Sequence, residues 1–307
     1  MNGTDVLRPG FVQIRVLELE SALTHYRDRV GLTEVSREAD GRVYLKAYDE
    51  FDRHSIILRE ADAPGMDFLG FKVTSDAALS AYGEALREWG LEVLEVEAGE
   101  QPGMGRRLAF VAPSGHRFDL YADVELSEYG PMVENPDVWR EDPRGMRAIR
   151  LDHCLLYGDE IAATKKIFID VLGFKLSEIG YDPDGGEIIN FLTCSNKAHD
   201  IAFVPYLEKN KFHHCAFLVE DWKDIGHAAD LMSRYDVPVD IGPTRHGATR
   251  GQTIYFFDPS GNRNEVFAGG YTYYPDSPIR TWTGDELGKN VFYYEKQLNE
   301  RFLTVVT

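Results

Sequence analysis

A turn followed by a strand occurs twice in this sequence, as Ala112-Pro-Ser-Gly-His-Arg-Phe-Asp-Leu-Tyr-Ala122 and again as Asp258-Pro-Ser-Gly-Asn-Arg-Asn-Glu-Val-Phe-Ala268. The Pro-Ser-Gly run favours a tight turn, and the alternation of apolar and polar residues after it is typical of a strand with two different faces. Similarity between distant segments of one chain indicates duplicated structure. The repeated stretch therefore predicts two equivalent halves that both end in this turn and strand.

The rest of each half follows the same order of strand, helix, several strands, helix and strands. The expected elements are residues 10–16, 20–30, 43–47, 55–58, 68–73, 77–89 and 112–122 in the first half, and residues 150–156, 161–171, 188–192, 200–203, 214–219, 222–235 and 258–268 in the second. This order corresponds to two βαβββ units in each half. The helix of such a unit covers one face of its strands, so two units side by side can curl their free faces into a cup. We therefore expect an α+β fold of two tandem repeats, each made of paired βαβββ modules.

The sequence divides into four parts. Residues 1–125 hold the first repeat, and residues 126–149 form a linker that is rich in Pro, Asp, Glu and Gly at its start. Residues 150–270 hold the second repeat. Residues 271–307 form a C-terminal tail, expected to contribute to the pocket, in which residues 285–302 are rich in aromatic side chains and helical in pattern.

Composition and charge exclude several classes of protein. The formal net charge of −18 argues against nucleic-acid and anionic-membrane partners, which require basic patches. No run of 18 or more apolar residues is present, so no membrane span is expected. The first residues lack the pattern of a secretory signal, and the three cysteines form no Cys-x-x-Cys pair. We therefore expect reduced thiols and a cytoplasmic protein.

The alternation of strand residues separates a helix-covered face from a free face in the second half. Helix-facing apolar residues are expected at Cys154, Leu156, Cys215, Phe217, Val266 and Ala268. This leaves His153, His214 and Glu265 on the free face. It also selects His214 over its neighbour His213, which shares a face with Cys215 and is expected to be packed or hydrogen-bonded.

Two imidazoles and one carboxylate on one side of a metal leave adjacent coordination positions open. This arrangement suits non-haem Fe(II), with Mn(II) as the next candidate, and zinc would accept the same ligands. A single histidine in a strand is more often an ordinary polar residue, but three coincidences of face in one half favour a metal site.

The first half lacks these ligands. It has Gln13, Phe68 and Asp119 at the corresponding places, which lie 140, 146 and 146 residues earlier. Asp119 is expected at the surface or at the edge of the core. We also expect His54 to be structural or exposed and His116 to be solvated in its turn, while Cys154 and Cys215 are expected to be core thiols.

The stretch from His246 through Tyr255 and Asp258-Pro-Ser-Gly261 to Glu265 resembles the signature of the extradiol ring-cleavage dioxygenases of the vicinal oxygen chelate superfamily. The likeness extends along the chain and is greatest to the bacterial catechol 2,3-dioxygenases. The segments that carry it are Arg8–Gly10, Gly41–Ala47, Leu58–Asp62, Pro64–Phe68, Lys197–Asp200 and Leu298–Phe302.

This resemblance implies the glyoxalase-like fold of that superfamily, an Fe(II) cofactor and a homotetramer. It implies that both atoms of O2 are inserted into catechol, or into alkyl- or halo-substituted catechols, to give products of the 2-hydroxymuconate semialdehyde type. The family's iron ligands fall on His153, His214 and Glu265. By the same likeness, His199 fits as the acid/base, and His246 and Tyr255 fit as hydrogen-bond partners of the substrate. The family's pocket positions fall on Phe191, Ala248, Val291 and Phe302.

Two other functions remain possible on this fold, which also hosts isomerases, lyases and proteins that only bind ligands. A glyoxalase-like isomerase is expected to draw metal ligands from both repeats, and Gln13 and Phe68 argue against that. A ligand-sequestering binding protein would not need the three ligands of the second half.

Overall fold

The computed structural model describes residues 4–307 and gives the first half of the chain a complete set of strands and helices. They are β1 (Val6–Val16), α1 (Leu19–Leu23), η1 (Thr24–Val30), β2 (Thr33–Arg37), β3 (Val43–Lys46), β4 (Ile56–Glu60), β5 (Gly65–Val73), α2 (Asp76–Glu88), β6 (Val93–Val96), β7 (Arg107–Val111) and β8 (Arg117–Tyr121).

The second half repeats this order and ends in the tail. Its elements are β9 (Arg150–Gly158), α3 (Ile161–Asp170), β10 (Lys175–Tyr181), β11 (Glu187–Thr193), β12 (Ile201–Pro205), β13 (Lys211–Leu218), α4 (Trp222–Arg234), β14 (Val239–Arg245), β15 (Gly251–Phe257) and β16 (Arg263–Gly269). The tail adds β17 (Arg280–Trp282), η2 (Gly284–Glu286), α5 (Leu287–Val291) and α6 (Glu300–Thr304).

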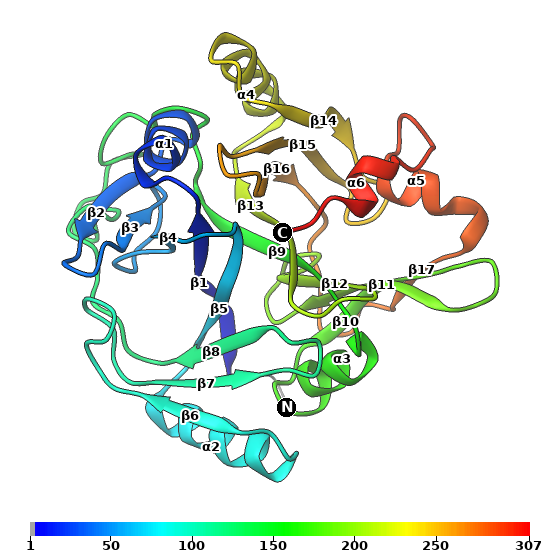
Figure 1. Ribbon diagram of the computed structural model, residues 1–307, viewed down its shortest axis with the longest axis horizontal. Helices are drawn as coiled ribbons and strands as arrows, with labels where there is room; N and C mark the ends of the chain where they lie inside the picture. The colour runs from blue at the N-terminus through cyan, green and yellow to red at the C-terminus, as the bar shows by residue number, and fades with distance from the viewer. Residues whose placement is uncertain (1–3) are drawn as a thin grey trace.

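The strands form two sheets of the same design, one in each half (Figure 1). The first has the order β2-β3-β4-β1-β5-β8-β7-β6. The second has the equivalent order β10-β11-β12-β9-β13-β16-β15-β14, with β17 added beyond β10. In each sheet two βαβββ units meet through a central antiparallel pair, β1 with β5 and β9 with β13. The predicted fold of tandem repeats with paired βαβββ modules is therefore confirmed.

The helix-covered faces of both sheets belong to one apolar core. Val12 and Ile14 of β1 and Cys154 and Leu156 of β9 are fully buried in it, as their alternation predicted. Aromatic rings join the two halves, since the ring centroids of Phe118 and Phe168 lie 4.9 Å apart, and those of Phe71 and Phe174 lie 5.4 Å apart. Cys154 and Cys215 are buried free thiols of this core.

The helix expected over residues 20–30 is in fact two segments. A short α-helix, α1, continues into the wider π-helical turns of η1. Within η1, His25 and Tyr26 are buried against the second half: His25 Nε2 lies 2.8 Å from Asn264 Oδ1, and the Tyr26 hydroxyl donates to Asp258 Oδ2 at 3.0 Å. The turn before β16 is therefore held by the first half of the chain.

The equivalent turn before β8 is held by the second half. The Ser114 amide donates to Thr164 Oγ1 at 3.0 Å, and His116 Nε2 lies 3.1 Å from the Lys211 carbonyl oxygen. His116 is fully buried, so the expectation that it is solvated was wrong. Burial also lowers the pKa of His116 to about 4. The two halves therefore clasp each other through the same repeated turn.

His54, which was expected to be structural or exposed, is buried in the first half, with Nε2 3.1 Å from Gln101 Oε1. Burial lowers the pKa of His54 to about 4.

The tail lies along the open face of the second sheet, where α5 and α6 appear beside β14 to β16 in Figure 1. Residues 285–302 are helical only in part, because a turn separates α5 from α6 and Asn299 Oδ1 caps α6 by accepting the Phe302 amide at 3.1 Å. Within residues 4–307, no helix is both long enough and apolar enough to cross a membrane.

Candidate metal centre

Three neighbouring strands at the centre of the second sheet carry the predicted ligands. His153 lies on β9, His214 on β13 and Glu265 on β16, and their candidate ligand atoms all lie within 4.8 Å of one another. Glu265 Oε2 lies 3.0 Å from His153 Nε2 and 3.2 Å from His214 Nε2. All three side chains are buried, so these donor atoms converge on one small space shielded from solvent.

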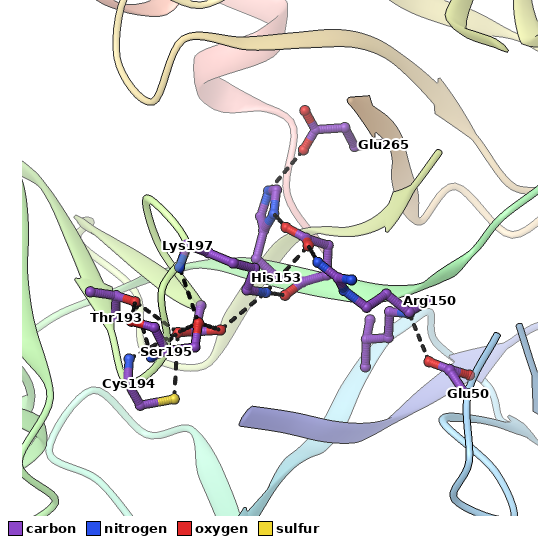
Figure 2. A network of polar contacts seen from close by, with 11 residues as sticks. Glu50, Arg150, His153, Thr193, Cys194, Ser195, Lys197 and Glu265 are labelled. Carbon is purple, nitrogen blue, oxygen red and sulfur yellow. Dashed lines mark hydrogen bonds and ion pairs between the residues drawn. The ribbon is translucent and has the colours of Figure 1, made fainter. Parts of the chain in front are cut away.

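Each ligand is oriented by a further side chain. His153 Nδ1 donates to Asp152 Oδ2 at 2.8 Å, so Nε2, which faces Glu265, is the nitrogen left to bind a metal (Figure 2). Thr253 Oγ1 donates to Glu265 Oε1 at 2.5 Å, which leaves Oε2 toward the imidazoles. Partners of this kind fix the tautomer and direction of metal ligands. The donor set therefore fits a divalent metal in both residue type and orientation.

Burial and close contact shift the pKa values of His153 and Glu265 in opposite directions. Burial opposes a charge on His153, but hydrogen bonds to Asp152 and Glu265 outweigh burial and raise its pKa to about 9. Burial likewise opposes a charge on Glu265, but the adjacent imidazoles of His153, His214 and His246 outweigh burial and hold the pKa of Glu265 well below the usual range. The carboxylate is therefore ionised, and a bound cation would replace a proton on His153.

A polar network around Lys197, Thr193, Cys194 and Ser195 lies beside His153 (Figure 2). Lys197 Nζ lies 3.3 Å from Asp152 Oδ1 and 3.0 Å from Asp200 Oδ1. Asp152 precedes His153 and Asp200 follows His199, so this lysine links the two segments that carry the histidines. Asp200 Oδ2 closes the loop by accepting hydrogen bonds from Thr193 Oγ1 and from the amides of Cys194 and Ser195.

The ring of His199 itself is held by packing. Its centroid lies 4.0 Å from that of His153 and 5.3 Å from that of Phe191, and no hydrogen bond fixes either ring nitrogen within the described chain. Burial, followed by repulsion from a protonated His153, lowers the pKa of His199 well below its usual range. The ring is therefore neutral and can accept a proton.

His246 and Tyr255 lie on another side of the cluster. His246 Nδ1 donates to the Val291 carbonyl oxygen in the tail, so the Tyr255 hydroxyl donates to His246 Nε2, at 2.8 Å. The Tyr255 ring centroid lies 5.2 Å from that of His214. Burial, and then the charge of Glu265, raise the pKa of Tyr255 well above its usual value, so its hydroxyl keeps the proton.

A cavity of about 320 Å³ opens over these side chains. All four of the predicted pocket residues line it, namely Phe191, Ala248, Val291 and Phe302. Side chains from α5, from α6 and from Leu298, which all belong to the tail, line part of the cavity. No lysine or arginine is among the residues that line it, so its wall beyond the metal cluster is largely apolar.

Several residues of the site were missed in the sequence. Leu155 and Tyr157 also line the cavity, and they follow His153 at the alternating positions of β9, so the same face rule could have found them. Thr253 alternates with Tyr255 on β15 in the same way. Asp152 carried no such signal, because it acts from the opposite side of the strand.

His213 departs from the alternation. The pairing of β13 with β9 shifts between Phe212 and His214, so an irregularity places two consecutive histidines toward the cavity side. The prediction that His213 shares a face with Cys215 was therefore wrong. The prediction of a packed or hydrogen-bonded histidine is confirmed, because His213 is buried with Nε2 2.7 Å from the Phe302 carbonyl oxygen.

The equivalent place in the first half contains an ion pair. Asp119 is fully buried, contrary to expectation, and Oδ2 accepts a hydrogen bond from Arg107 Nη1 at 2.6 Å. Arg117 Nε donates to Asp119 Oδ1 at 2.8 Å. Gln13 Nε2 donates to Asp67 Oδ2 at 2.6 Å. Two guanidinium groups thus neutralise Asp119 in the first half, whereas two imidazoles face the equivalent Glu265 in the second half.

Comparisons with known proteins agree with this division. Residues 66–125 match the catechol 2,3-dioxygenase-like N-terminal domain, and residues 150–266 match the glyoxalase/bleomycin resistance protein/dioxygenase superfamily. The chain is 55% identical over 304 residues to the metapyrocatechase of Pseudomonas sp. (strain CF600), covering 98% of this chain and 99% of that protein. It is 28% identical over 302 residues to a manganese-dependent 2,3-dihydroxybiphenyl 1,2-dioxygenase of Geobacillus genomosp. 3, covering 96% and 95%.

A solved structure gives the same result. The 2,3-dioxygenase LapB from Pseudomonas sp. KL28 superposes with a TM-score of 0.89 at 50% identity, covering 92% of this chain and 99% of that chain. The identity extends over nearly the whole length, and it agrees with the fold of four βαβββ units and with the cluster of two histidines and a glutamate in the second half. The chain therefore belongs to the metapyrocatechase (catechol 2,3-dioxygenase) family of extradiol dioxygenases.

Proposed function

We propose that this protein is an extradiol dioxygenase that cleaves catechols beside their two hydroxyl groups. The ring C–C bond next to the diol breaks, and both atoms of O2 end up in the open-chain product, which is of the 2-hydroxymuconate semialdehyde type. The observation that carries the proposal is the convergence of His153, His214 and Glu265 at the base of an apolar cavity. Three ligands on one side leave room for a chelating catechol and for O2 on the other.

Fe(II) is the proposed cofactor. Two imidazoles and a carboxylate suit Fe(II), and Mn(II) remains an alternative because one relative is described as manganese-dependent. When bound, the metal holds the two reactants together and conducts electrons between them.

Three side chains around the cluster act on protons and charge. His199, neutral and free of hydrogen bonds, is placed to accept a catechol proton and to return it later. Tyr255 keeps its proton and donates it to His246 Nε2 here, and by turning away from His246 the hydroxyl would donate it to a catecholate oxygen. These roles for His199, His246 and Tyr255 are part of the proposal.

The cavity supports uncharged ring substituents. Its far wall contains Ile188, Val204 and Leu303, and none of the described residues that line it is a lysine or an arginine. Alkyl and halogen groups are therefore accommodated at little cost, whereas a carboxylate would lose its hydration without a partner. We propose catechol, alkylcatechols and halocatechols as substrates, and Phe191, Ala248, Val291 and Phe302 as the residues that contact the ring.

The proposed organisation has four parts: a non-catalytic repeat (1–125), a linker (126–149), a catalytic repeat (150–270) and a tail that completes the pocket (271–307). Exposed apolar side chains on the linker, including Val133 and Val138, support self-association, and we propose a cytoplasmic homotetramer. Sedimentation analysis tests the assembly, and a monomer at micromolar concentration would rule it out.

The activity is tested with metal-free protein that is loaded with Fe(II) under anaerobic conditions and then mixed with catechol in air. We expect a yellow product and equal consumption of catechol and O2, and parallel loading with Mn(II) compares the two metals. Absence of O2 uptake with catechol, methylcatechols and chlorocatechols would reject the proposal. Product formation without O2 would favour a glyoxalase-like isomerase, and ligand binding without turnover would favour a sequestering protein.

A further inference from the structure

The irregularity in β13 brings His213 into a position that the regular alternation would not allow. Phe212 pairs with Leu156 and His214 with Leu155, so His213 is the extra residue between them. Its ring stacks on Tyr157, with centroids 4.8 Å apart and planes inclined by 18°. The Phe302 ring meets it edge-on at 4.7 Å. His213 is 1% exposed, so both ring nitrogens depend on protein partners.

Those partners determine where the protons of two histidines lie. His213 Nε2 lies 2.7 Å from the Phe302 carbonyl oxygen, which only accepts hydrogen bonds, so Nε2 carries a proton. In the uncharged ring Nδ1 is then an acceptor, and it faces His214 Nδ1 at 2.7 Å. His214 Nδ1 must therefore donate, which leaves His214 Nε2 without a proton.

Arg263 supports the same segment from its backbone side, because its buried guanidinium places Nη1 3.5 Å from the His213 carbonyl oxygen. His214 Nε2 is the atom that faces Glu265 Oε2 in the ligand cluster. The hydrogen bonds of His213 thus leave the correct nitrogen of His214 available to a metal.

The same residue connects the metal cluster to the tail. Phe302 belongs to α6, and its ring lines the cavity and packs on Tyr255 with centroids 4.8 Å apart. Beside it, the Phe212 amide donates to the Thr307 carbonyl oxygen at 2.8 Å, and the Thr307 amide donates back at 3.0 Å. Arg263 Nη1 donates to the Val305 carbonyl oxygen at 2.8 Å. The end of the chain is therefore fastened at the irregularity that carries His213.

We propose that His213 is a positioning residue with two separable tasks: its Nδ1 orients His214 as an Nε2 metal ligand, and its Nε2 fastens α6 over the substrate cavity. This inference rests on the metal site of the proposed function but not on its reaction. Because one ring performs both tasks, metal binding and order of the tail support each other, and the coupling acts in both directions.

Three substitutions separate the two tasks. His213→Asn keeps an acceptor near the place of Nδ1 and loses the contact with Phe302. His213→Gln places its amide near Nε2 and loses the contact with His214. His213→Phe keeps the stacked ring and loses both. His227→Phe is the matched control, because His227 lies on α4, contacts the Gly145 carbonyl oxygen through Nε2, and is neither a candidate ligand nor a residue of the cavity.

Two measurements on metal-free full-length protein read the tasks separately. Titration with Mn(II) gives the metal dissociation constant without any need for turnover, and hydrogen–deuterium exchange of residues 299–307 reports the order of α6. We expect the Phe variant to bind Mn(II) about 10–100-fold more weakly, as is typical when the partner of a metal-ligating histidine is removed. Its tail amides should exchange faster than those of the wild type and of the His227→Phe control.

The other two variants decide the inference. The Asn variant should bind Mn(II) more tightly than the Gln variant, and the Gln variant should protect the tail better than the Asn variant. Equal metal affinity in the wild type and the Phe variant, or the reverse order of Asn and Gln, would overturn the proposal. If the Phe variant does not fold, the Asn and Gln pair still carries the test. If the Mn(II) affinities follow this order but the wild type does not turn over catechol, the proposed reaction is refuted and the role of His213 stands.

Discussion

Asp119 on β8 and Glu265 on β16 occupy equivalent places in the two sheets, yet they meet opposite surroundings. Arg107 and Arg117 surround Asp119, whereas Glu265 meets two imidazoles and the small hydroxyl of Thr253. Arg107 and Thr253 themselves stand at equivalent positions, each one strand away from its carboxylate. The Arg107 guanidinium therefore occupies the space beside Asp119 where the second half has only the small hydroxyl of Thr253.

This difference teaches what a metal site requires on a duplicated fold. A buried carboxylate is common to both halves, so it does not define the site. The second half adds two imidazoles whose Nδ1 atoms are already hydrogen-bonded within the protein. It also has the small, uncharged Thr253 where the first half has Arg107. The first half satisfies its carboxylate internally and contributes instead by holding the turn before β16 through Tyr26. One half carries the proposed metal site, and the other supports the strand that carries Glu265.

The largest effect is expected when the second half is made to resemble the first. His153→Gln introduces the residue that the first half has at position 13. We expect Fe(II) to be lost and ring cleavage to fall by more than about 100-fold, since removal of residues behind metal ligands already costs 10–100-fold. Iron content after desalting and initial rates check this, and iron retained at full stoichiometry would contradict the assignment.

His199→Gln should separate proton transfer from metal binding. Loss of a general acid/base lowers kcat by about 10²–10⁴-fold. His199 is not among the three ligand residues, so iron content should stay at the wild-type level. Rates measured beside iron analysis of the same sample test this role. Iron loss in proportion to the loss of rate would instead make His199 a ligand or a support of one.

Arg107→Met should break the ion pair of the first half and spare the metal. Arg107 and Asp119 are both buried, so removal of one partner leaves a buried charge that costs about 3–5 kcal/mol, toward the lower end because Arg117 remains. The free energy of unfolding from urea denaturation should fall accordingly, with Mn(II) affinity unchanged. Arg87→Met is the control, since its pair with Glu95 is exposed and such pairs contribute about 0–1 kcal/mol. Weaker Mn(II) binding in the Arg107 variant would show that the two cups are coupled.

The smallest effect is a pH dependence of stability that arises at His116, in the turn through which the first half contacts the second. The pKa of His116 is about 4 in the folded protein, below its ordinary value of about 6.5 in an unfolded chain. The unfolded state therefore binds the extra proton, and stability falls as pH is lowered from 6.5 toward 4, by up to about 3 kcal/mol.

His116→Gln lacks this titration. The variant should be less stable than the wild type at pH 7.5, because it weakens the contacts of the ring with Ser114 and Lys211. The difference should shrink as the pH falls, and urea midpoints at pH 7.5 and pH 5 measure it. A difference that grows on acidification would mean that His116 is charged in the folded state.

Much of the fold and of the cluster could be predicted because both depend on local pattern. The repeat defined the βαβββ units, and regular alternation in β9 and β16 placed His153 and Glu265 correctly. Prediction failed where distant parts of the chain meet. His116 and Asp119 are buried by contacts with another half and another strand, and the irregularity at His213 breaks the period of two on which face assignment rests. None of these has a signature within a few residues of sequence.

Anomalous scattering at the iron absorption edge, from crystals of Fe(II)-loaded protein, tests the central claim most directly. We predict one strong peak in each chain, within bonding distance of His153 Nε2, His214 Nε2 and Glu265, and no peak beside Asp119 in the first half. A peak at Asp119, or an iron held by any other set of residues, would contradict the account.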